Sequence, residues 1–319
     1  MSAAPNPLAH FDAAPTVGAL LIGTLCSYVL FGITTVQAYL YYGRFQDDPW
    51  TLKGMVAFVW MFEFAHAASI GHANYFYAVI NYGNPRSLLG KMPVSLALSV
   101  VLGAIITTLV QSFFAFRIWN LAANRFVRII PLLLWITGGA YLVGSIAATT
   151  LAIGAKNIPS FLNQYGWLLL TPWIVNLIND NVITISLVLL LLSSRSKGFQ
   201  RTSALVDKLI MWTIETGLIT SIFSVLTLAF YQAERTNFVW VGIQFVKARL
   251  FANSLLASLN SRQTLRALNA SLSDSNGAVT SRGGYNGTNG QTQTGTLNIA
   301  MTKVTLREDG GPVYGYKSA

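Results

Sequence analysis

Long apolar segments, separated by short polar stretches, dominate the first part of the chain. Seven such segments are present, at residues 17–42, 54–80, 93–116, 129–153, 167–192, 207–231 and 237–259. Each is long enough to cross the roughly 30 Å of bilayer hydrocarbon as an α-helix, which rises about 1.5 Å per residue. The pattern therefore predicts an all-α membrane protein built as a bundle of seven transmembrane helices.

The pattern changes after the seventh segment, where Ser, Gly, Asn, Thr and Gln predominate. The stretch SDSNGAVTSRGGYNGTNGQTQTGT, at 273–296, has too few apolar residues to offset the entropy lost on ordering. We therefore expect three parts: a short extracellular or lumenal N-terminus at 1–16, a transmembrane domain at 17–262, and a disordered cytosolic tail at 263–319.

Composition agrees with a location in a bilayer. Only 10% of the residues are charged and 53% are hydrophobic, with a mean hydropathy of +0.51. Typical soluble chains are about 25% charged, so this chain has too little polar surface to cover a water-soluble globule. We expect a multi-pass protein of the plasma membrane or an endomembrane, with the lipid bilayer as its main partner.

The net charge of +10 is informative mainly through the positions of the basic residues along the chain. Basic residues are scattered through the loops and form no patch, so no nucleic-acid partner is expected. Because Lys and Arg accumulate on the cytosolic side of membrane proteins, their positions predict the orientation, with the N-terminus outside and the C-terminus in the cytosol. The outer loops hold four of them, Arg86, Lys91, Lys156 and Arg235, and the inner loops hold eleven, Arg44, Lys53, Arg117, Arg125, Arg128, Arg195, Lys197, Arg201, Lys208, Arg262 and Arg266.

The second span, 54–80, carries polar residues at membrane depth. Since a helix turns about 100° per residue, Glu63, His66, Asn74 and Tyr77 fall within one narrow arc, whereas His72 lies on the opposite side. Charged groups near the bilayer centre are costly and normally face the bundle interior. This face of the second span is therefore expected to point inward.

Other spans carry charges at a similar depth, roughly 12–18 Å from the cytosolic helix ends at about 1.5 Å per residue. The fifth span holds Asp180, the sixth Glu215, and the seventh Lys247 and Arg249, with Asn253 one turn after Arg249. We predict an ion pair between Arg249 and a carboxylate, with Glu63 or Asp180 as the acid. These residues and the polar face of the second span form the candidate intramembrane site.

Three interpretations of this polar site remain open: ion pairs that only fix which helices meet, a pocket for a small ligand, and a pathway for protons or ions. A metal site is not expected, since the chain has only three histidines and His66 and His72 point apart. No cofactor is expected either. Lys247 could form a retinal Schiff base, but the acidic counterion is missing from the third span.

Two passages carry a family resemblance: one runs from the second span through NYGNP to VQSFFAFRIWNLA, and the other comprises RTSALVDKLIMWTIETGLITSIFSVLTLAF and NSLLASLNSR. Over 17–262 the chain resembles uncharacterised seven-span membrane proteins of mushroom-forming fungi, which carry a C-terminal domain of unknown function. The resemblance implies a membrane bundle but no substrate, cofactor or reaction. It places Glu63, His66 and Asp180 where similar proteins tend to have the same residue types, whereas Glu215 departs from their pattern.

The sequence favours a non-enzymatic, receptor-like protein that senses a small apolar or amphipathic ligand or a partner. The expected topology, the basic loop at 193–208 and the Ser/Thr-rich tail support this reading, with the loop and tail as the surface for a cytosolic partner. Neither D-R-Y at the end of the third span nor N-P-x-x-Y in the seventh is present. A proton-coupled or small-molecule transporter and a structural membrane scaffold are the alternatives.

Overall fold

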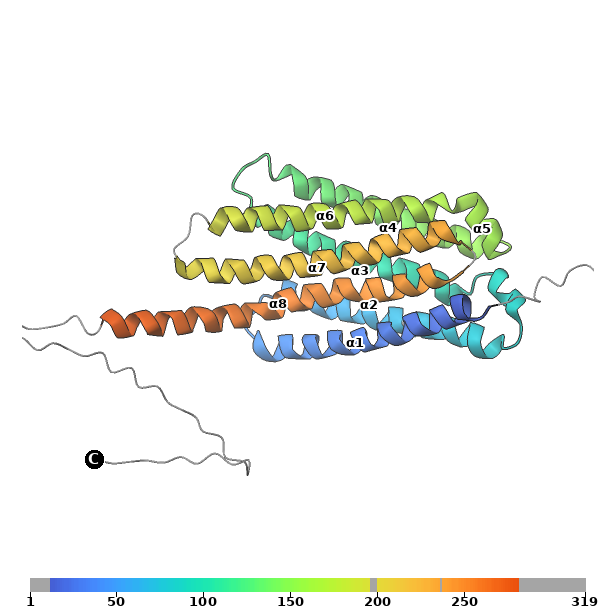
Figure 1. Ribbon diagram of the computed structural model, residues 1–319, viewed down its shortest axis with the longest axis horizontal. Coiled ribbons are helices and arrows are strands. Elements are labelled where there is room, and N and C mark those ends of the chain that lie inside the picture. Colours follow the sequence, from blue (N-terminus) through green and yellow to red (C-terminus); the bar gives the residue numbers. More distant parts are fainter. Residues whose placement is uncertain (1–11, 196–199, 236, 281–319) are drawn as a thin grey trace, which may run out of the picture. The chain divides into compact units, whose positions relative to one another are not determined.

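The computed structural model describes residues 12–195, 200–235 and 237–280, and these residues are helical with short connections. Seven of the described helices are long, and these seven run along a common direction (Figure 1). In chain order the elements are η1 (Ala14–Gly18), α1 (Ala19–Arg44), α2 (Trp50–Tyr75), η2 (Phe76–Ile80), η3 (Pro85–Leu89), α3 (Val94–Leu121), α4 (Ile129–Gly154), α5 (Ile158–Tyr165), α6 (Trp167–Arg195), α7 (Gln200–Ala233) and α8 (Val239–Thr280).

Local sequence explains where several helices begin. Pro49 and Pro93 adopt extended backbone angles immediately before α2 and α3. The Asn157 side chain caps α5, which the apolar pattern did not predict, by accepting a hydrogen bond of 2.8 Å from the backbone N–H of Ser160. Since α5 has only eight residues, it is too short to cross a bilayer and instead covers one end of the bundle (Figure 1).

Six helices are long and apolar enough to cross a membrane, which indicates a multi-pass membrane protein. They are η1 with α1, η2 with α2, α3, α4, and the described parts of α6 and α7. In α3, 56% of the most apolar window is buried, whereas only 11% is buried in α7. The bundle is therefore organised around α3, which packs against α2, α4 and α6.

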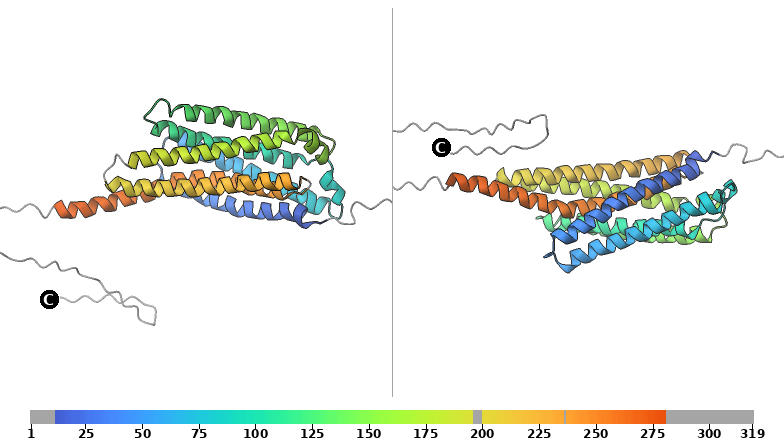
Figure 2. Two further views of the ribbon diagram at one scale, coloured as in Figure 1. Left: turned by 45° about the horizontal axis from the view of Figure 1, so that its top comes forward. Right: turned by 90° about the horizontal axis from the view of Figure 1, so that it is seen from below.

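The predicted seventh span corresponds to α8, which is absent from these six because it carries several polar and charged residues in its first half. Its first half nevertheless runs alongside the other long helices in every view (Figures 1 and 2). Its Gly242 lies so close to α1 that a Cβ atom on Gly23 would stand 2.5 Å from the Gly242 Cα. Whether α8 crosses a membrane stays a prediction.

The helical bundle belongs to the unit Met1–Asp274. The helix α8 continues to Thr280, so the predicted start of the tail at residue 263 falls inside a helix. The stretch QTLRALNASL after Arg262 contains several good helix formers and no Gly or Pro, which explains the difference. The rest of the predicted tail, 281–319, lies outside the described residues, as do residues 196–199 of the predicted partner loop.

Candidate functional site

Arg249 of α8 forms the predicted ion pair with Glu63 of α2, and both side chains are fully buried. The Arg249 Nη1 group donates to the Glu63 carboxylate and also, at 2.7 Å, to the Glu63 backbone carbonyl. Its Nε group donates to Ser27 Oγ of α1 at 2.8 Å. One fully buried arginine therefore joins the three helices α1, α2 and α8.

Neighbouring residues extend this junction along α1. The guanidinium carbon of Arg249 lies 5.2 Å from the ring centroid of Phe31. Asn253, one turn later on α8, donates to the backbone carbonyls of Leu30 at 3.1 Å and Arg249 at 2.9 Å. These contacts show that the Arg249 and Asn253 side of α8 faces α1 and α2.

Asp180 of α6 belongs to a separate cluster and does not pair with Arg249. Its Oδ1 atom accepts a hydrogen bond of 2.8 Å from Gln111 Nε2 of α3, which also donates to Asn176 Oδ1 at 2.8 Å. Sequence reasoning did not include Gln111, although it is the one carboxamide in the apolar run 93–116 and was therefore a detectable signal.

Lys247 lies near Asp180 on the opposite side of α8 from Arg249. Its charge interacts with that of Asp180, but the two side chains form no direct ion pair within the described structure. Lys247 is 4% exposed, and its Nζ atom lies 5.9 Å from the ring centroid of Phe251. The interior thus holds two charge clusters, Arg249 with Glu63 and Lys247 near Asp180.

The polar face predicted for the second span points inward: Glu63, His66 and Tyr77 are buried, whereas His72 is exposed. The His66 Nδ1, Asn74 Oδ1 and Tyr77 hydroxyl have no hydrogen-bond partner among the described residues. These groups therefore share a face without forming a continuous network.

Glu215 does not join either cluster, because its side chain lies on the exposed face of α7. Its predicted depth in the membrane is the same as that of the other charged residues, but it lies on a face of its helix that points away from the interior. The neighbouring hydroxyls of Thr213 and Thr216 instead donate to backbone carbonyls of α7 itself.

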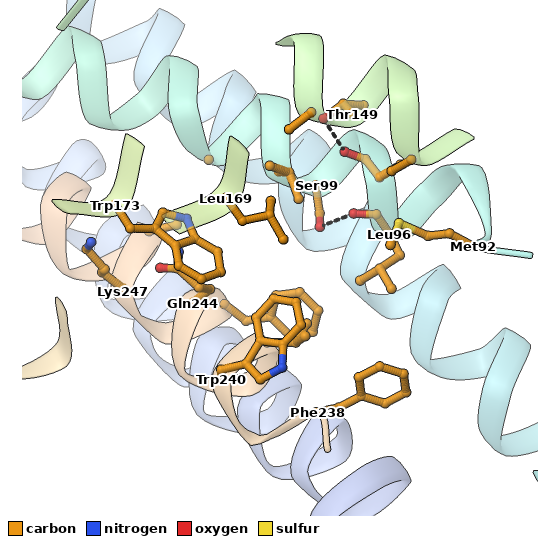
Figure 3. A pocket seen from close by; sticks show the side chains of 18 of the residues that line it. Met92, Leu96, Ser99, Thr149, Leu169, Trp173, Phe238, Trp240, Gln244 and Lys247 are labelled. Atoms are coloured by element: carbon orange, nitrogen blue, oxygen red, sulfur yellow. Dashed lines mark hydrogen bonds between the residues drawn. The ribbon is translucent and has the colours of Figure 1, made fainter. Parts of the chain in front are cut away.

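A cavity of about 90 Å³ lies between α3, α4, α5, α6 and the first half of α8. Figure 3 shows Lys247 and Trp173 at one end of it, and Met92 and Phe238 at the other. Met92 and Phe238 precede α3 and α8, so this second end lies where those helices begin. The wall is largely apolar and aromatic; its polar side chains are His66, Ser99, Thr107, Tyr141, Thr149, Gln244 and Lys247.

Two of these polar groups are already engaged. The Ser99 hydroxyl donates to the Leu96 carbonyl at 2.7 Å and the Thr149 hydroxyl to the Ala97 carbonyl at 3.2 Å (Figure 3). On the facing wall, the indole rings of Trp173 and Trp240 have centroids 5.5 Å apart and each packs edge-on against Tyr231. A rigid aromatic wall therefore faces the cavity from α6 and α8.

Residues 176–264 match a family described as Family of unknown function (DUF6534). This DUF6534 segment bears out the domain of unknown function that the resemblance implied, whereas the fungal part of the resemblance stays a prediction. No curated protein and no solved structure matches the chain significantly.

The DUF6534 segment supplies only part of each charge cluster. It contains both basic residues, Lys247 and Arg249, together with Asp180. Glu63 and Gln111 lie before it in the chain, on α2 and α3. The interior described above is therefore completed by helices outside the matched segment.

Proposed function

We propose that this protein is a receptor-like membrane protein that binds a small amphipathic molecule in the cavity between α3, α4, α6 and α8. The observation that carries this proposal is an apolar, aromatic cavity with a few polar side chains in its wall, of which Lys247 lies at the inner end, away from Met92 and Phe238 (Figure 3). Sites for small ligands typically combine these two features, because apolar area provides affinity and a few polar groups fix orientation. An ion-pair network whose only role is structural requires no such space.

In this proposal α8 is the seventh transmembrane helix, the N-terminus lies outside and α8 ends in the cytosol. The distribution of Lys and Arg over the loops supports this orientation. The burial of Phe245, Arg249 and Phe251 supports a different part of the proposal, because it makes the first half of α8 part of the bundle core. The cavity would then approach the outer surface near the start of α8.

The topology is testable with single cysteines. In a Cys26→Ser background, Ala13→Cys before α1 and Gln263→Cys in α8 place thiols at two exposed positions. We expect a membrane-impermeant maleimide to label Ala13→Cys from outside intact cells and Gln263→Cys only after permeabilisation. Labelling of both from the same side would show that α8 does not cross the membrane.

Ligand binding can be tested with 4-bromobenzyl alcohol, whose bromine quenches tryptophan on contact. With purified protein in nanodiscs we expect saturable quenching of Trp173 and Trp240, above the linear quenching of lipid-facing tryptophans. Replacing either of these two residues with phenylalanine should reduce the saturable part. Binding without proton or ion flux in loaded vesicles would separate a receptor from a carrier.

A cavity-filling variant supplies the matched control. A Cβ on Gly103 would meet Ala248 Cβ and His66 Nε2 at 3.7 Å, so a Gly103→Leu side chain extends into the cavity wall without a backbone clash. Gly139→Leu adds the same side chain on α4 with nothing within 4 Å of its Cβ. We expect only Gly103→Leu to abolish the saturable quenching. Absence of saturable quenching in the unmodified protein would favour the scaffold alternative.

A further inference from the structure

We infer that the cavity selects ligands with a carboxylate group, which binds Lys247 at its inner end; this inference rests on the proposed ligand cavity. The cavity wall contains no Asp or Glu side chain among the described residues, whereas it contains Lys247 and His66. A cationic ligand would therefore be repelled by the positive charge of Lys247 and would find no carboxylate to bind. An anionic ligand would find in Lys247 a charge of opposite sign.

Lys247 is an incompletely satisfied cation. Although it is 4% exposed, its ammonium donates no hydrogen bond to any described protein oxygen, and its nearest aromatic ring, Phe251, lies 5.9 Å away. A buried charge without hydrogen-bond partners is strongly unfavourable. A ligand carboxylate in the adjoining cavity would supply the missing acceptor.

The position of Asp180 explains why this carboxylate does not itself accept a hydrogen bond from Lys247. Asp180 does not line this cavity; it lines a second one, of about 40 Å³, between α3, α6, α7 and α8. Gln111 and Asn176 donate to its two oxygens at 2.8 and 3.4 Å, which holds the carboxylate on that side. Asp180 therefore acts on Lys247 over a distance, offsetting its charge without occupying its hydrogen-bond donors.

The size of the cavity limits the ligand. At roughly 10–15 Å³ of such volume for each water-sized group, about 90 Å³ accommodates roughly six to nine groups. A benzoate or a short-chain fatty acid is of this size. The aromatic wall formed by Trp173 and Trp240 suits the apolar part of such a ligand. Lys247 lies at the Trp173 end of the cavity (Figure 3), where the carboxylate would bind.

The selectivity can be measured with a matched pair, 4-bromobenzoate and 4-bromobenzyl alcohol, using the same tryptophan quenching. A charge-assisted hydrogen bond corresponds to about a tenfold to hundredfold preference for the benzoate. Lys247→Met should remove this preference, while the alcohol should still bind saturably, which also shows that the variant is folded. Lys247→Arg should retain the preference, and Lys208→Met on α7, outside the cavity lining, should not affect it.

The Asp180→Asn variant distinguishes binding of a ligand by Lys247 from a purely structural role of Lys247. Removing the nearby negative charge should tighten binding of the benzoate by about tenfold while leaving the alcohol unaffected. If Lys247→Met proves unstable because Asp180 is left without a nearby cation, the Lys247→Met/Asp180→Asn double variant removes both charges and should also show no preference.

The outcomes separate this inference from the proposed function. Saturable binding of the alcohol without preference for the benzoate, or a preference that survives Lys247→Met, would overturn the carboxylate inference and leave the ligand cavity standing. Absence of saturable binding by either probe would overturn both.

Discussion

Replacing Arg249 with leucine is expected to destabilise the protein by about 3–5 kcal/mol, the cost of leaving one member of a buried ion pair uncompensated. The change removes the donor to the Glu63 carboxylate and carbonyl and to Ser27 Oγ. Glu63 would then remain as a fully buried carboxylate. The folded fraction after size-exclusion chromatography and the thermal midpoint in detergent measure the loss.

The Arg249→Leu/Glu63→Leu double variant tests the cause. Because it leaves no isolated charge, it should be considerably more stable than the sum of the two single variants predicts. Arg262→Leu is the control: Arg262 contacts Asp48 at 2.5 Å, but its side chain is 30% exposed, so the loss should be near 1 kcal/mol. Additive losses in the double variant would show that the pair is not energetically coupled.

Gly23→Ala is expected to cost about 3 kcal/mol, at the upper end of the range for overpacked positions. The added Cβ would stand 2.5 Å from the Gly242 Cα and 2.7 Å from its carbonyl oxygen. Both are backbone atoms of α8, which cannot move aside by changing a rotamer. The helices α1 and α8 would have to separate, which would also weaken the Ser27 contact with Arg249.

The control for this prediction lies on the same helix. Gly32 has no atom within 4 Å of an added Cβ. Gly32→Ala should therefore be neutral or should stabilise α1 by up to about 1 kcal/mol, because alanine is the better helix former. Equal thermal midpoints for Gly23→Ala and Gly32→Ala would contradict the close approach of α1 and α8.

The helical bundle and the inward face of the second span could be predicted because both depend on local periodicity. Arg249 and Glu63 could be named as partners, but depth alone did not decide between Glu63 and Asp180. That choice depends on the rotation of each helix about its own axis, which packing determines. For the same reason Glu215 was grouped with the interior residues, although its helix face is exposed.

The cavity and the role of Gln111 lay beyond sequence reasoning for a different reason. A cavity exists only where side chains from several helices fail to fill the space between them, and no single segment encodes this. Gln111 stood alone in an apolar run and gave a signal, yet its partners Asn176 and Asp180 are 65 and 69 residues away. The short helix α5 carried no transmembrane pattern at all.

The Arg249 junction also has a consequence for the order of assembly. Ser27 and Glu63 lie 222 and 186 residues before Arg249 in the chain. During synthesis α1 and α2 therefore emerge long before α8, and Glu63 has no counter-charge from Arg249 until α8 has been made. The last long helix, α8, therefore supplies the partner for the buried polar groups of α1 and α2. A chain truncated before Arg249 would therefore keep Glu63 without its counter-charge.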